Sequence, residues 1–434
     1  MSSILIYSPA AGPRMRYIMT EMLCRMSGFQ IEFCSDEDFF RKSHAPKINY
    51  SHNPLSADAL HVVPHGLLEE SGIRDQPGLM LLLEQGQSFS KKNKLQLPAE
   101  FSAGKIEFDL FSAGFYLLSR YEEYLPFKAD VHGRFPATES VAFRFGFLQK
   151  PLVQEWASAF AALLSEKYPQ LKVVKPPFRK LLTVDVDQAF KYRHKPWWRI
   201  AAGLLKYPNT FRERMAVWMG LQSDPFDIFG QLETYFSDKD AEISFFILIG
   251  NYGPFDKNTD HRSSTFRNII KKLAEKYPVG IHPSYASSSA DYMKSQMLLA
   301  NEIERLQAVA ETPVLRSRQH FLKLRFPVTY RKLLQAGISD DFSMGYADQI
   351  GFRASTALPF FWYDLQAEST TDLLVHPFQV MDVTLRDYLK LSPEKANESV
   401  REMRQLVERF GGEFTIIWHN SSFDNSWEGW SPHF

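Results

Sequence analysis

The chain has 434 residues, more than the roughly 250 to 300 that a single hydrophobic core supports, so we expect two domains. Lys plus Arg and Asp plus Glu are both 50, which leaves no excess charge of either sign to attract nucleic acid or an anionic membrane. Hydrophobic residues make up 44% and aromatic residues 14%, enough to fill a large core. These numbers predict a folded globular protein.

The N-terminal region shows neither a disulfide framework nor a targeting signal. Cys24 and Cys34 are the only cysteines in the sequence, so we expect any metal to be held by His, Asp or Glu. Residues 1–11 lack a basic segment, and their apolar run, residues 4–7, is too short for a signal peptide or a membrane span. We therefore predict a cytoplasmic protein without membrane insertion; its oligomeric state is open.

Residues 1–175 are predicted to form a smaller N-terminal α/β domain, an accessory domain of unknown role. A strand at 4–7 is followed by a Pro/Gly break and a helical stretch near 17–23. A second helix is expected within 111–124, before the polar turn 130–134. The charged residues of this stretch could form an active-site rim, but we favour a helix cap with surface ion pairs. They are Arg120, Glu122, Glu123, His132 and Arg134.

The second half, residues 180–434, starts after the break at Pro176 and Pro177. Apolar strands then alternate with amphipathic helices, the pattern of βα units around a parallel sheet or barrel. We expect a distorted (β/α) barrel of seven or eight parallel strands, with the N-terminal domain beside its mouth. The expected helices are 151–167 before the break and 264–277, 290–310, 329–337 and 392–411 after it.

Three predicted strands of this half end in residues suited to metal or proton chemistry. Residues 181–184 lead into Asp185 and Asp187, residues 279–281 into His282, and residues 414–418 into His419. Ligands of α/β folds bind at the carboxyl ends of the strands, so these side chains are expected to converge on one mouth. For Asp185 and Asp187 we expect a turn at the strand end that brings both carboxylates to this site. Such a set can supply a divalent cation together with an acid and a base.

The order of these motifs resembles that of metal-dependent polysaccharide deacetylases, carbohydrate esterases of the family-four type. The similarity covers about the last 250 residues. It implies that Asp185 is the base, that Asp187 and His282 bind the metal, and that His419 is the catalytic acid. The segment 316–320 falls where the family has an Arg-containing loop. The resemblance therefore implies that Arg318 holds Asp185 in position. Residues 243–249 are similar to the family's second strand.

Two departures from the family pattern bear on the metal. The usual adjacent Asp pair is spread to Asp185 and Asp187, and Ala286 stands where a second metal-binding His is expected. His320 is the nearest candidate to complete the shell, although a His buried beside Phe321 is an equally good interpretation. The cation would be Zn²⁺, with Mn²⁺ and Co²⁺ as options.

The resemblance implies a hydrolase that removes N-acetyl or O-acetyl groups from a carbohydrate, a hydrolysis of a linear amide in the N-acetyl case. Two alternatives stay open: a sugar-binding relic of the deacetylase fold that has lost catalysis, and a glycoside hydrolase in which Asp185 and Asp341 flank a bond.

Other residues carry weaker predictions. His376 could face the cleft, but we favour a His packed within a strand layer, because the apolar run continues past it. A carboxylate of the loop 340–348 could orient Arg318 or a substrate hydroxyl. Six aromatic residues in expected loops could stack on sugar rings, although most such residues belong to cores. They are Trp197, Trp198, Tyr252, Tyr285, Tyr346 and Trp362.

Overall fold

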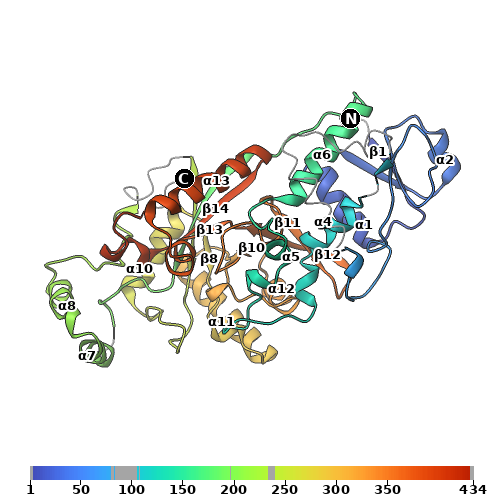
Figure 1. The fold of residues 1–434 in the computed structure, drawn as a ribbon. Coiled ribbons are helices and arrows are strands. Elements are labelled where there is room, and N and C mark those ends of the chain that lie inside the picture. Colours follow the sequence, from blue (N-terminus) through green and yellow to red (C-terminus); the bar gives the residue numbers. More distant parts are fainter. Residues whose placement is uncertain are drawn as a thin grey trace.

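The computed structural model contains two β-sheets with helices packed around them (Figure 1). It describes residues 3–79, 83, 105–106, 108–195, 197–232 and 240–430. Within these ranges, none of the helices combines the length and the apolar character that a bilayer span requires.

The smaller sheet is built from the N-terminal half and is parallel throughout its described pairings, in the order β2-β1-β3-β4-β5. Its strands are β1 (Ser3–Tyr7), β2 (Gln30–Cys34), β3 (Lys47–Tyr50), β4 (Leu60–Val62) and β5 (Lys105–Ile106). The helices of this half are α1 (Pro13–Met19), α2 (Glu37–Lys42), α4 (Leu110–Leu118), α5 (Val141–Arg144) and α6 (Leu152–Lys167). The expected small α/β unit and its strand at 4–7 are thus confirmed.

The larger sheet has nine strands in the order β11-β12-β10-β9-β8-β7-β6-β14-β13. Of its eight pairings, only β11 with β12 is antiparallel. Its strands are β6 (Phe178–Val186), β7 (Ala241–Ile247), β8 (Val279–Ile281), β9 (Arg316–Ser317), β10 (Asp340–Met344), β11 (Phe360–Asp364), β12 (Ser369–Pro377), β13 (Val380–Met381) and β14 (Gly412–His419). Among the described residues β11 does not pair with β13, so the closed barrel of seven or eight strands is not confirmed.

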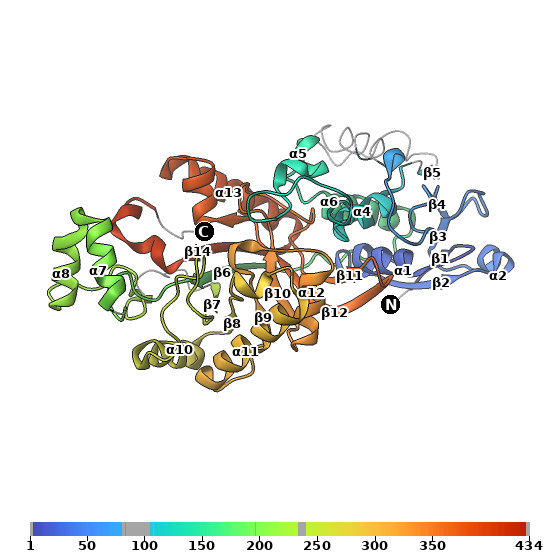
Figure 2. The ribbon, with the colours of Figure 1, turned by 90° about the horizontal axis from the view of Figure 1, so that it is seen from below.

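The expected helices of this half are present, with ends shifted by one or a few residues. They are α10 (Ser264–Lys276), α11 (Tyr292–Ala310), α12 (Val328–Gln335) and α13 (Pro393–Phe410). In Figure 2, α10 and α11 lie along one side of the large sheet and α13 along the opposite side. Two further helices, α7 (Trp197–Lys206) and α8 (Phe211–Trp218), project away from the rest of the molecule (Figures 1 and 2).

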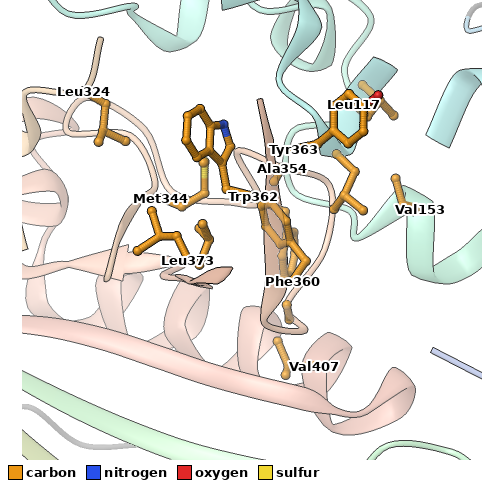
Figure 3. Close-up of a cluster of buried hydrophobic side chains, with 14 of the residues drawn as sticks. Leu117, Val153, Leu324, Met344, Ala354, Phe360, Trp362, Tyr363, Leu373 and Val407 are labelled. Atoms are coloured by element: carbon orange, nitrogen blue, oxygen red, sulfur yellow. The ribbon is translucent and has the colours of Figure 1, made fainter. Parts of the chain in front are cut away.

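One hydrophobic core joins the two halves. Figure 3 shows Leu117 of α4 and Val153 of α6 in the same cluster as Ala354, Phe360 and Tyr363. Burial of such side chains contributes roughly 1.5 to 3 kcal/mol each, so the contact stabilises both halves. The division into domains 1–175 and 180–434 stays a prediction.

The charged stretch near residue 120 also lies at the junction of the halves, and our expectation of surface ion pairs was wrong. Arg120 is buried and forms ion pairs with Glu122 and Glu123, each 2.8 Å long. Glu123 in turn receives two hydrogen bonds from Arg353 of the C-terminal half. The sequence pattern identified the charges but not their partner, because Arg353 is 230 residues away in the chain.

Candidate active site

The two aspartates of the candidate site lie at the carboxyl end of β6. Asp185 is the next-to-last residue of this strand and is in register with Phe246 of β7 and His419 of β14. Asp187 follows one residue after the strand. Asp187 stands at a bend where the strand ends, so a change of chain direction accompanies the approach of both carboxylates to the site, as we expected.

Asp187, His282 and His320 converge, with one ligand atom of each lying within 4.8 Å of the others. Oδ1 of Asp187 lies 3.1 Å from Nε2 of His282 and 3.6 Å from Nε2 of His320. The Asp187 side chain is 37% exposed, whereas both imidazoles are buried. The imidazole of His320 therefore faces the carboxylate, and its ring edge also contacts Phe321.

The opposite nitrogen of each imidazole is held by a second partner. Nδ1 of His282 lies 2.6 Å from the carbonyl oxygen of Arg318, to which it donates as an N–H. Nδ1 of His320 lies 3.1 Å from a carboxylate oxygen of Asp256. A hydrogen bond at Nδ1 fixes the ring orientation and leaves Nε2 to a metal, the usual arrangement around metal-binding histidines.

The charges of these groups suit a cation. Burial opposes ionisation of Asp187, but His320 and His282 hold the pKa of its carboxyl well below the usual range. Oδ1 of Asp187 and Oδ1 of Asp185 are buried and accept no hydrogen bond from a described residue. One carboxylate and two imidazole nitrogens with an unsatisfied oxygen between them fit a divalent cation such as Zn²⁺.

His419 stands beside this cluster and is paired with Asp382. Its Nδ1 lies 2.8 Å from Oδ1 of Asp382, and its backbone N–H donates to Oδ2 of the same residue at 2.7 Å. Nε2 lies 3.9 Å from Oδ2 of Asp187. Burial lowers the pKa of His419, but Asp382 and the two site aspartates outweigh it and raise the pKa to about 10. The imidazole is therefore cationic at neutral pH.

Arg318 is fully buried next to Asp185 but does not hydrogen-bond it. Its Nη1 lies 4.0 Å from Oδ1 of Asp185. None of its three guanidinium nitrogens has a hydrogen-bond partner among the described residues, and the group lies over the rings of Phe246 and Phe378. Burial lowers the pKa of Arg318, opposed by Asp185 and Asp341. The contact with Asp185 is thus electrostatic at this distance.

Asp341 and His376, the reserve candidates, lie outside this cluster. Both carboxylate oxygens of Asp341 accept hydrogen bonds from Ser343, and burial raises the pKa of Asp341 to about 6. His376 contacts Glu413 at 2.7 Å and Asp340 at 3.0 Å. These geometries fit the packed interpretation of His376, and they leave Asp341 without an open face toward a glycosidic bond.

The aromatic candidates divide into core and surface residues. Tyr346 and Trp362 are buried in the core. Tyr252 is exposed, and Tyr285 stacks on Phe255 with ring centroids 4.3 Å apart. The side chains of Trp197 and Trp198 lie outside the described part of the chain.

Sequence reasoning missed two carboxylates. Asp256 lies in the loop after β7, and Asp382 follows β13 directly. Both therefore come after strands of the large sheet, so the same rule that identified His282 and His419 could have found them. The strand β13 has only two residues, which is too short for an apolar pattern to be recognised.

Comparisons with known proteins add little to this geometry. Residues 4–169 match the model of a family of unknown function, DUF7033. No curated protein matches the chain.

Similar solved structures cover somewhat more than half of the chain. A protein from Mycobacterium smegmatis described as a polysaccharide deacetylase is 17% identical with a TM-score of 0.36, over 58% of this chain and 83% of that one. The polysaccharide deacetylase from Bacillus cereus is 14% identical with a TM-score of 0.27, over 57% and 82%. A mutant pseudoenzyme of the CE4 family with restored activity is 11% identical with a TM-score of 0.27, over 59% and 62%. At such low identity and TM-score, these similarities carry no inference about activity.

Proposed function

We propose that this protein is a metal-dependent hydrolase that removes N-acetyl or O-acetyl groups from a carbohydrate. The observation that carries the proposal is the convergence of Asp187, His282 and His320, with Asp185 and His419 beside them. Asp187, His282 and His320 would hold Zn²⁺, Mn²⁺ or Co²⁺. The cation would supply Lewis acidity at the acyl carbonyl and lower the pKa of water.

Asp185 and His419 divide the proton transfers. Asp185 has a buried oxygen without a hydrogen-bond partner, so it can accept the proton of the attacking water. His419 is cationic, and Asp382 engages its Nδ1, so Nε2 is the atom that donates a proton to the leaving amine or alcohol. Products are acetate and a free amino sugar or hydroxyl. Arg318 places its positive charge 4.0 Å from Oδ1 of Asp185.

The aromatic surroundings support a carbohydrate substrate. A cavity of about 280 Å³ next to Asp256 is lined by Tyr252, Phe255 and Tyr285. Aromatic faces stack on the apolar C–H faces of pyranose rings. Asp256 lines this cavity and also hydrogen-bonds His320, so these two residues connect the cavity to the proposed cation position.

The test combines metal content with acetate release from an N-acetylated oligosaccharide. We expect stoichiometric metal in the purified protein. Asp185→Asn should keep this metal and lose a factor of about 10² to 10⁴ in turnover, whereas Asp187→Asn should lose the metal. Asp260→Asn, which changes a half-exposed carboxylate away from the cluster, is the matched control.

Three outcomes would count against the proposal. If Asp185→Asn strips the cation and Asp187→Asn keeps it, the two roles are exchanged. If both variants deacetylate at the wild-type rate, the assignment of these residues fails. Metal-free protein that binds an oligosaccharide without releasing acetate would favour a binding relic.

A further inference from the structure

A second cavity is lined in part by residues that flank the two histidines in the chain. It has a volume of about 240 Å³ and is bounded by the loop after β8 and by the first turns of α11 and α12. Its wall includes Pro283, which follows His282, and Gln319, which precedes His320. Chain neighbours of both histidines thus belong to the cavity wall, although neither histidine lines it.

The wall of this cavity is strongly basic although the whole chain has no net charge. Lys323, Arg325 and Lys332 all line it, and among the described residues the lining includes no Asp or Glu. None of the three forms an ion pair with a described residue. A wall with three cations and no carboxylate attracts anions, even though Asp130 and Asp256 act on Lys323, and Asp291 on Lys332, from outside the wall.

Lys332 is the most informative of the three cations. It is only 5% exposed, and its ammonium group hydrogen-bonds Ser295 and lies 5.1 Å from the centre of the Tyr292 ring. Burial and Arg325 lower the pKa of Lys332, and Asp291 opposes them. Asp291 caps α11 through the backbone N–H of Lys294. A buried ammonium group without a paired carboxylate is costly, so a ligand that pairs with it gains free energy.

Neutral donors complete the wall. The helix α12 starts at Val328, its preceding residue Pro327 provides no side-chain cap, and both Val328 and Thr329 line the cavity. The partial positive charge of a helix N-terminus favours an anion. The hydroxyl of Ser288 donates to Gln319 from the opposite wall at 3.4 Å, a bond long enough to be exchanged for one to a ligand.

We propose that this cavity is an oxyanion-binding subsite that takes a phosphate or carboxylate group of the substrate. Arg325 is exposed and can reach an oxyanion with its planar fork, while Lys332 supplies a point charge from within. Because Pro283 and Gln319 connect the wall to His282 and His320, the anion in this proposal belongs to the same sugar as the acetyl group or to a neighbouring one. Only this link to the substrate rests on the proposed function; the binding of an oxyanion does not.

The first experiment measures binding of inorganic phosphate by calorimetry, without turnover. We expect Arg325→Gln and Lys332→Met each to weaken binding by roughly 10- to 100-fold, the loss of one charge-assisted hydrogen bond. Lys294→Gln removes an exposed lysine of α11 that does not line the cavity, and it should bind as the wild type does. Because Arg325 is exposed, its replacement tests the cavity even if Lys332→Met fails to fold.

Phosphate could instead bind at a metal, so Asp187→Asn is included. Binding that persists in Asp187→Asn and weakens in Arg325→Gln supports the cavity. Binding that disappears in Asp187→Asn and is unchanged in Arg325→Gln places phosphate at the metal and overturns the proposal, as does the absence of phosphate binding.

The second experiment compares acetate release from three probes: an N-acetylhexosamine phosphate, an N-acetylated uronic acid and a neutral N-acetylhexosamine. We expect a higher kcat/KM for one anionic probe, which identifies the source of the oxyanion, and a rise in KM for that probe alone in Arg325→Gln. Equal kcat/KM for all three overturns the link to the substrate. Phosphate binding in the cavity without acetate release from any probe would mean that the deacetylase proposal fails while the subsite stands.

Discussion

Two fully buried arginines of the C-terminal half show opposite degrees of pairing. Arg353 donates to both carboxylate oxygens of Glu123 and, at 2.9 Å, to the carbonyl oxygen of Gly345. Arg318 has three guanidinium nitrogens without a hydrogen-bond partner among the described residues. Their exposed fractions are 2% and 0%, so burial does not explain the difference.

The difference separates a structural charge from a functional one. The network around Arg353 has its main charges paired and joins the two halves of the molecule. The charges around Arg318 leave oxygen and nitrogen atoms unsatisfied, which native structures tolerate mainly where a ligand or a reaction uses them. The lack of hydrogen-bond partners for buried charges, rather than their presence, therefore marks the candidate site.

The largest expected effect is on the free energy of unfolding, and it should differ between variants of the two arginines. Arg353→Met should lower the free energy of unfolding by about 3 to 5 kcal/mol, because it leaves the buried Glu123 carboxylate with only Arg120 of its two cationic partners. Arg318→Met should change it by only about 1 kcal/mol, because it removes a buried charge that has no hydrogen bonds to lose. Urea unfolding followed by circular dichroism measures both. Equal losses in the two variants would break the comparison.

The next effect concerns metal affinity. Asp256→Asn should weaken metal binding by about 10- to 100-fold, because Asp256 orients His320 without belonging to the three proposed ligands. A competition titration with a chelating dye gives the affinity, and Asp260→Asn again serves as the control. Wild-type affinity in Asp256→Asn would show that His320 needs no orienting carboxylate or binds no metal.

The smallest effect is on the pH dependence of turnover. Asp382→Asn removes the main group that raises the pKa of His419, so the protonated fraction should fall at alkaline pH, about tenfold for each unit of pKa lost. We expect near-normal turnover at pH 6 and a growing deficit toward pH 9. The pH profile of kcat tests this; a profile that keeps its wild-type shape would exclude His419 as the acid.

The same pair also predicts a trend in stability. The pKa of His419 in the folded protein, about 10, is above its usual unfolded value of about 6.5. Its contribution to stability is therefore fully present below pH 6.5 and is lost as the pH rises toward 10. In Asp382→Asn this dependence of the unfolding free energy on pH should flatten.

The sequence predicted which side chains meet more closely than it predicted the sheet that holds them, and the roles of these side chains stay predictions. Asp185, His282 and His419 each follow an apolar strand, and the rule that ligands bind at the carboxyl ends of strands was enough to predict that they meet. His320 was ambiguous, because a residue in a loop has no periodic pattern that indicates its direction. Its orientation depends on Asp256, 64 residues earlier in the chain.

The local sequence pattern alone does not determine whether the large sheet closes into a barrel. Strands β9 and β13 have two residues each, and β11 runs antiparallel to β12, so the number and direction of the strands depend on pairings between distant segments. The burial of Arg120 could not be predicted for the same reason, because it also depends on a contact between distant segments. A charge near a helix end looks solvated in the sequence, and only the partner on the other half makes its burial possible.

The adjacency of β6 and β14 has a consequence for biosynthesis. Hydrogen-bonded neighbours such as Thr183 and Ile416 are 233 residues apart, so a growing chain exposes one edge of β6 until the last strand has been made. An open apolar edge of this kind invites pairing with other chains. All three proposed cation ligands leave the ribosome before His419 does. Synthesis order alone would thus make the proposed cation ligands available before the proposed acid.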